Sequence, residues 1–87
     1  MKIKSGFIIR QVAGENVVLP CGDNAGMNIV ISLNDTGAFL WRALENESTV
    51  ESLVEALLGE YAVERNVAEN SVNSFLNLLR QNKFLEE

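Results

Sequence analysis

The chain has 87 residues, enough for one small domain over residues 1–87, and 47% of them are apolar. Twelve acidic residues against seven basic ones give a net charge of −5, which disfavours a phosphate-binding surface and therefore nucleic acid as a partner. No apolar run is long enough to cross a bilayer and no signal peptide is recognisable, so we expect a cytoplasmic protein with no membrane partner.

The N-terminal third of the chain predicts three strands. Residues 6–13, GFIIRQVA, and residues 15–20, ENVVLP, are the first two, and the turn 13–16 between them has the flexible residues of a hairpin. After a loop rich in Gly, Asp and Asn at 21–26, residues 27–33, MNIVISL, form the third strand. Strands joined this closely predict an antiparallel meander, one face of which must be covered by helices.

The rest of the chain predicts helices. Asn34 is placed to cap a first helix at about residues 35–44, which is apolar over most of its circumference. A second helix begins after Ser48 or Thr49, either of which can cap it, and its apolar residues repeat at helical spacing as far as Tyr61. Both helices therefore have an identifiable start and a face that belongs in a core.

The third predicted helix spans roughly residues 66–81, and a start at Glu64 is the alternative. Phe84 and Leu85 follow it and are expected to pack back onto the core. Trp41, on the short apolar first helix, is expected to be a core anchor rather than a binding residue. The fold class is α+β, with a three-stranded antiparallel sheet followed by a three-helix, winged-helix-like bundle in the order βββααα.

The side chains available for catalysis are few. Histidine is absent, which excludes a histidine-based triad and a histidine metal site. Cys21, the one cysteine, can build neither an internal disulfide nor a thiolate zinc site. No glycine-rich phosphate loop is present, and carboxylate pairs such as Glu51 and Glu55 belong on a solvated helix surface. We therefore expect no enzymatic activity, no catalytic residue, no metal and no cofactor.

Residues 33–64, LNDTGAFLWRALENESTVESLVEALLGEYAVE, and 71–85, SVNSFLNLLRQNKFL, resemble the PqqD family. Proteins of this family are small and combine a three-stranded sheet with a winged-helix-like trio of helices. The matching positions are Leu33, Asn34, Thr36, Leu40, Trp41, Leu44, Thr49, Val50, Tyr61, Val72, Phe75, Leu76 and Leu79. Most of them are core and capping positions rather than a chemical motif.

The resemblance implies a function in peptide recognition. PqqD-like proteins bind the leader segment of a ribosomally made, post-translationally modified precursor peptide and deliver it to a modifying enzyme, often a radical SAM protein. The leader adds as a strand to the edge of the third strand and lies against the last helix, a mode in which main-chain bonds supply affinity. The implied peptide-binding residues are Met27, Asn28, Ile29, Val30, Ile31, Ser32, Ser71, Ser74, Phe75 and Leu78.

Other interpretations stay open at this point. Phe75 fits ordinary core packing as well as a groove, whereas Leu78 fits a groove better. A winged-helix DNA-binding protein is the alternative from another class, although the last helix offers only Arg80 as a base within 66–81. A third possibility is an interaction domain whose edge strand pairs with its own copy, which gives a homodimer.

Overall fold

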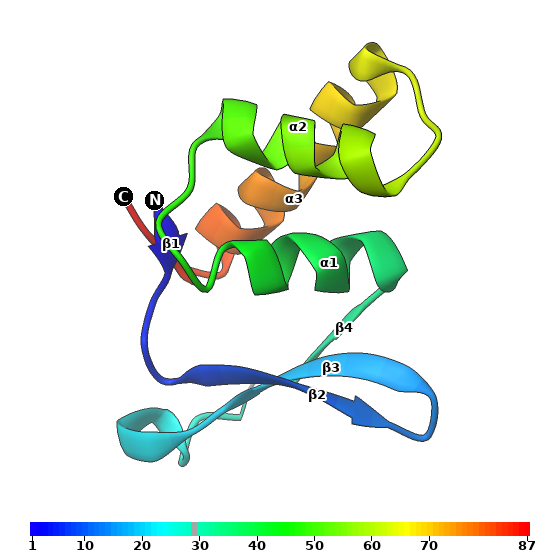
Figure 1. Cartoon of the computed structure of the whole chain (residues 1–87). Coiled ribbons are helices and arrows are strands. Elements are labelled where there is room, and N and C mark those ends of the chain that lie inside the picture. The colour runs from blue at the N-terminus through cyan, green and yellow to red at the C-terminus, as the bar shows by residue number, and fades with distance from the viewer. Residues whose placement is uncertain (29) are drawn as a thin grey trace.

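Three antiparallel strands followed by three helices make up most of the molecule, as Figure 1 shows for the computed structural model, which describes residues 1–28 and 30–87. In chain order the elements are β1 Lys2–Ile3, β2 Phe7–Val12, β3 Glu15–Pro20, the 3-10 helix η1 Gly22–Asn24, β4 Ile31–Leu33, α1 Asp35–Ala43, α2 Val50–Glu60, α3 Arg65–Gln81 and β5 Leu85–Glu86. The predicted α+β class and the order βββααα are confirmed by β2-β3-β4 and α1-α2-α3. The short antiparallel pair β1–β5, which joins the two ends of the chain, was not predicted.

The β2–β3 hairpin has the turn that the sequence predicts. Ala13 and Gly14 both have positive φ, 52° and 83°, and Val12 lies opposite Glu15 on the two sides of the turn. Two central residues with positive φ are the mark of a type I′ turn, which matches the twist of the strands it joins. Gly14 adopts this conformation without strain, whereas the Cβ of Ala13 makes it unfavourable.

Replacing Ala13 with Asn should stabilise the protein. Asn tolerates the left-handed region better than Ala does, and Asn-Gly is the preferred pair for this turn. We expect the free energy of unfolding to rise by about 0.5–1 kcal/mol, measured by urea denaturation. Ala13→Val, which places a β-branched side chain at the same positive φ, should lower it. An Asn variant no more stable than the Val variant would contradict this account of the turn.

The third strand is shorter than the sequence predicts. Of residues 27–33, only Ile31–Leu33 form β4, which pairs antiparallel with β3. The prediction was wrong for Met27, Asn28 and Val30, which are exposed and belong to no strand, while the prediction for Ile29 lies outside the described residues. The ladder between β3 and β4 ends early because β3 terminates at Pro20, which has no N–H with which to continue it.

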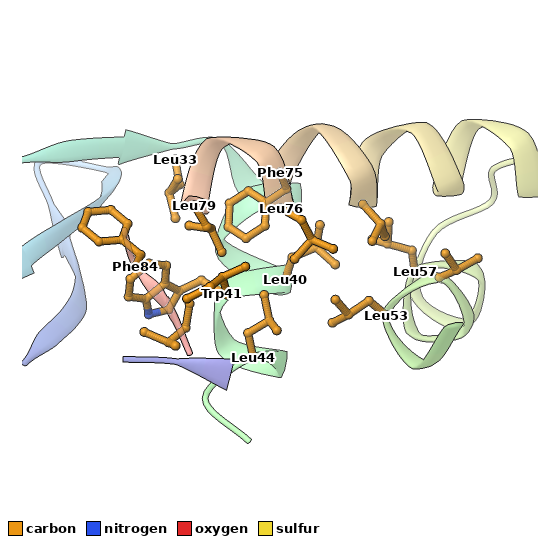
Figure 2. Close-up of a cluster of buried hydrophobic side chains, with 14 of the residues drawn as sticks. Leu33, Leu40, Trp41, Leu44, Leu53, Leu57, Phe75, Leu76, Leu79 and Phe84 are labelled. Atoms are coloured by element: carbon orange, nitrogen blue, oxygen red, sulfur yellow. The ribbon is translucent and has the colours of Figure 1, made fainter. Parts of the chain in front are cut away.

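The helices cover one face of the sheet and enclose the core, with α1 at its centre (Figures 1 and 2). Trp41 is fully buried, which confirms its predicted role as a core anchor. Its ring meets that of Phe84 edge-on, with centroids 5.8 Å apart, so the residues after α3 do pack back onto the core as predicted. Leu85, also buried, belongs to the same cluster.

The predicted caps of the first two helices are present at Asn34 and Thr49, whereas the last helix has no side-chain cap. The Gly37 amide donates to the Asn34 side-chain oxygen at 2.7 Å, which confirms Asn34 as the cap of α1. At α2 the cap is Thr49, whose hydroxyl accepts from the Ser52 amide at 3.0 Å, while the Ser52 hydroxyl accepts from the Thr49 amide at 2.9 Å. Helix α3 begins at Arg65, one residue from each of the two predicted starts, with Glu64 as its cap residue but no side-chain cap hydrogen bond.

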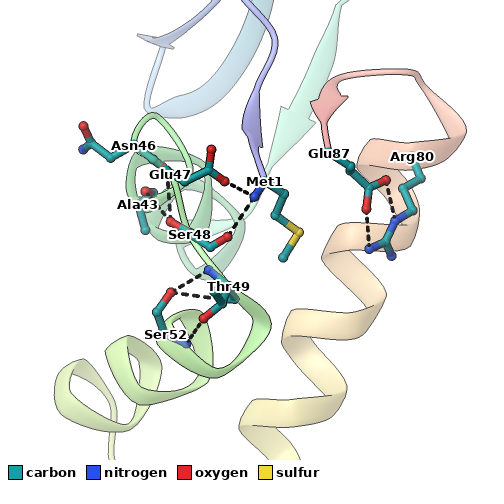
Figure 3. A network of polar contacts seen from close by, with 9 residues as sticks. All are labelled: Met1, Ala43, Asn46, Glu47, Ser48, Thr49, Ser52, Arg80 and Glu87. Atoms are coloured by element: carbon teal, nitrogen blue, oxygen red, sulfur yellow. Dashed lines mark hydrogen bonds and ion pairs between the residues drawn. The ribbon is translucent and has the colours of Figure 1, made fainter.

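Polar contacts fasten the N-terminus to the connection between α1 and α2, and the C-terminus to α3 (Figure 3). The amino group of Met1 pairs with the Glu47 carboxylate and donates to the Ser48 carbonyl at 3.0 Å. The hydrogen bond from this amino group holds the pKa of Glu47 below its usual range. At the other end, the Arg80 guanidinium donates to the Glu87 carboxylate at 3.1 Å. Among the described residues, no helix has the length and apolarity that crossing a bilayer requires.

Candidate functional site

A groove of about 490 Å³ lies between β4, the start of α1 and α3. It is lined by Ser32, Leu33, Asn34, Thr36, Gly37, Leu40, Asn70, Ser71, Ser74, Phe75 and Leu78. Its floor is apolar, because Leu33, Leu40 and Phe75 are buried, and its rim is polar, because Ser32 and Ser74 are exposed. We refer to this feature as the β4–α3 groove.

Gly37 allows the floor of the β4–α3 groove to close up. A Cβ at this position would lie 3.4 Å from Leu33 Cβ, 3.4 Å from Phe75 Cε1 and 3.2 Å from the Asn34 side-chain oxygen that caps α1. Because glycine has no side chain, strand β4 and the ring from α3 both approach the first turn of α1 closely. The three elements that form the groove therefore meet at one residue.

The open edge of β4 borders the groove. Within the described residues the sheet order is β2-β3-β4, so β4 is an edge strand with β3 as its one partner. The two-residue turn makes Val12 and Glu15 a hydrogen-bonded pair, and the direction of the backbone groups alternates along a strand from there. The N–H and C=O of Val17 therefore point toward β2. Ser32 lies opposite Val17, so its own N–H and C=O point away from β3, toward the open edge.

The structure brings half of the predicted peptide-binding residues together. The groove is lined by Ser32 from β4 and by Ser71, Ser74, Phe75 and Leu78 from α3. Phe75 is buried in the core cluster and also lines the groove, so its two predicted roles coincide. Met27, Asn28, Val30 and Ile31 are not part of the lining, and Ile29 is outside the described residues.

Several lining residues were not predicted. Asn70 lies four residues before Ser74 and eight before Leu78, and residues spaced by four share one face of a helix, so this spacing places it on their face of α3. Asn34 and Thr36 were identified from the sequence only as capping and family positions. The missing side chain of Gly37 predicts the close approach of a strand, which Leu33 of β4 confirms, but its place in the groove depends on which elements pack against it.

The β4–α3 groove contains no charged side chain among its described lining residues. Its serines have no histidine or carboxylate in the lining to act as a base, so nucleophilic catalysis finds no support there. Among the described residues, no three His, Cys, Asp or Glu side chains gather as a metal site would require. An uncharged groove beside an open strand edge is suited to recognising backbone and apolar side chains.

The basic residues of α3 are already paired with carboxylates. Arg65 donates to Glu55 at 2.5 Å and to Glu51 at 3.5 Å, and Arg80 pairs with Glu87. The hydrogen bond from Arg65 holds the pKa of Glu55 below its usual range, so that carboxylate stays charged near neutral pH. Neither guanidinium is presented alone, as contact with nucleic-acid phosphates would need.

Comparison with known proteins gives one family and two structures. The family model described as "Coenzyme PQQ synthesis protein D (PqqD)" matches residues 10–85. The structure of TbiB1 in complex with the TbiA(beta) leader peptide aligns with a TM-score of 0.79 and 28% identity, over 99% of this chain and 95% of that one. A lasso peptide synthetase B1 complexed with its leader peptide aligns with a TM-score of 0.77 and 22% identity, over 99% and 96%, which shows a shared fold. No curated protein matches this chain.

Proposed function

Because the chain belongs to the PqqD family, we propose that it binds the leader segment of a ribosomally made precursor peptide as an added strand along β4. The observation that carries the proposal is the continuity of the open β4 edge with the β4–α3 groove, which meet at Ser32. The structure of TbiB1, which holds the TbiA(beta) leader peptide, supports it by similarity over nearly the whole chain.

The proposed binding uses backbone and side chains separately. The N–H and C=O of Ser32 pair with the peptide backbone, which supplies affinity with little demand on sequence. Alternate peptide side chains point to one face and enter the groove, where Phe75 and Leu78 offer apolar contact. Ser71 and Ser74 line the rim and satisfy polar groups of the peptide. Selectivity then comes from the shape and apolar character of the floor.

The residues before β4 have a lesser part in the proposal. Met27, Asn28 and Val30 are exposed and outside the groove, so only a peptide longer than β4 would contact them. Ile31 packs against the core with its side chain and contributes through its backbone. Ile29, in the same predicted set, lies outside the described residues.

The protein then acts as an adaptor rather than as an enzyme. It presents the bound leader in the cytoplasm to a separate modifying enzyme, which we propose to be a radical SAM protein by family resemblance. Pairing of the β4 edge with a second copy would give a homodimer that competes with the peptide for the same backbone groups. Size-exclusion chromatography with and without peptide separates the two states.

A phage-displayed library of random peptides tests the proposal. Ser74→Trp fills the β4–α3 groove from an exposed position and leaves the core intact. Peptides selected on the wild-type protein should bind this variant at least roughly tenfold more weakly, because the ring occupies their place. Asn73→Trp is the matched control, since Asn73 is exposed on the same helix outside the groove. Equal binding to both variants and to the wild type would sink the proposal.

A further inference from the structure

A second, smaller pocket of about 80 Å³ adjoins the β4–α3 groove near the C-terminal end of α2. It is lined by Thr36, Leu57, Tyr61, Val63, Val67, Ala68 and Ser71. Thr36 and Ser71 line the groove as well, so the two hollows are neighbours that share these two residues as a common border. We call this feature the valine pocket, after Val63 and Val67.

The valine pocket is apolar and uncovered. Leu57 and Ala68 form its buried wall, and the side chains of Val63 and Val67 are 40% and 46% exposed. One exposed valine on a surface is ordinary. Two of them in the lining of one small pocket, beside the buried Leu57 and Ala68, form an apolar lining whose chemistry matches that of an aliphatic side chain.

The walls of the valine pocket are held in place without a ligand. The Tyr61 ring meets Phe39 edge-on, with centroids 5.7 Å apart and planes at 84°. The Val63 amide donates to the Tyr61 carbonyl at 3.0 Å, which fixes the bend between α2 and α3. Arg65, the first residue of α3, also donates to the Glu55 carboxylate of α2 at 2.5 Å. The shape of the pocket is therefore set before any peptide arrives.

Its volume decides which side chain fits. An engineered cavity of about 150 Å³ in an apolar protein interior binds a benzene molecule. The valine pocket has about half of that, 80 Å³. It has room for a branched aliphatic side chain such as that of Leu, Ile or Val, and an aromatic ring would stay mostly outside.

We propose that the valine pocket receives one branched aliphatic side chain of the bound peptide. That side chain belongs to the flank that passes the C-terminal end of β4, outside the stretch that pairs with Ser32, because Thr36, which borders both hollows, follows that end of the strand. The inference rests on the proposed function and specifies its substrate as a peptide with an aliphatic anchor beside the paired stretch.

The expected size of the effect follows from the area buried. Truncating such an anchor to Ala removes two or three methyl or methylene groups from a partly enclosed site. Peptide affinity should then fall roughly tenfold to fiftyfold. Replacing the valines of the pocket with polar residues should lower the affinity for the unchanged peptide by a similar factor.

Parallel selections with the phage-displayed random library test this. The targets are the wild-type protein, the double variant Val63→Ser with Val67→Ser, and a control double variant, Val12→Ser with Val50→Ser, at valines exposed outside both hollows. We expect Leu, Ile or Val at one flanking position in peptides selected on the wild type and the control, and loss of that preference on the pocket variant. Val67→Thr, which nearly keeps the valine shape, provides a second variant should the double one unfold.

Each outcome of these selections is decisive. The same flanking preference on the pocket variant, or an aromatic preference on the wild type, would overturn the inference while groove binding persists. Peptides that bind the wild type without sensitivity to Ser74→Trp would overturn the proposed function as well. Sensitivity to Ser74→Trp is thus the readout that tells the two failures apart.

Discussion

Replacing Ser32 with proline is expected to weaken peptide binding by roughly a hundredfold while the protein stays folded. Proline removes the N–H that Ser32 turns toward the open edge, and leaves a peptide carbonyl without its partner. Edge strands accept proline where its nitrogen faces solvent, so pairing of β4 with β3 should survive. Isothermal titration with a peptide selected from the displayed library measures the loss.

Ser32→Ala is the matched control for this experiment. It removes the hydroxyl but keeps the backbone N–H, so affinity should stay within about threefold of the wild type. Urea denaturation of both variants shows whether the fold is intact. If alanine were as damaging as proline, the serine side chain rather than the backbone edge would be the main contact, and strand addition would be wrong.

Replacing Trp41 with alanine is expected to cost the largest share of stability. Trp41 is fully buried between α1 and the C-terminal residues, and it meets Phe84 edge-on. Truncating a buried aromatic side chain to alanine costs about 3–5 kcal/mol. A small domain has only about 5–15 kcal/mol in total, so a large unfolded fraction is expected near body temperature. Thermal unfolding followed by circular dichroism measures the change.

Trp41→Phe separates packing from hydrogen bonding at the same site. Within the described residues the indole Nε1 of Trp41 is buried and has no hydrogen-bond partner. Phenylalanine therefore loses packing but no hydrogen bond, and we expect a cost of about 1–2 kcal/mol. A phenylalanine variant as unstable as the alanine variant would contradict the idea that ring packing dominates.

Local signals made much of the fold predictable from the sequence. The caps Asn34 and Thr49 and the turn at Ala13 and Gly14 depend on residues within a few positions, and all are present. The first helix is apolar over most of its circumference, and this likewise predicted that Trp41 is buried in the core. These features follow from the chain's own neighbouring residues, which a single sequence displays.

Features that depend on distant partners were harder to predict. The third strand looked continuous over residues 27–33, but its pairing stops because Pro20, in the strand beside it, has no N–H. The pair β1–β5 joins strands of two residues at opposite ends of the chain, too short to give any periodicity. The family resemblance implied Ser71 and Ser74 as groove residues, yet only packing shows that Gly37 lines the same groove.

The valine pocket could not be predicted from the sequence, because it too depends on residues that are brought together by the fold. Val63 and Val67 looked like residues of a connection and a helix start, and their meeting with Tyr61 depends on the bend between α2 and α3. The family resemblance therefore implied the backbone edge as the source of affinity, whereas the proposed second source of selectivity could be inferred only from the fold.

The central claim is that the peptide pairs with the backbone of Ser32, and amide hydrogen exchange at that residue tests it most directly. By the alternation of the ladder, the amides of Ile31 and Leu33 face β3 and should be protected in the free protein, whereas that of Ser32 should exchange freely. Addition of a selected peptide should slow exchange of the Ser32 amide, and the more of the protein is bound to peptide, the slower the exchange should be. A peptide that binds and leaves the Ser32 amide exchanging as before would contradict strand addition at β4.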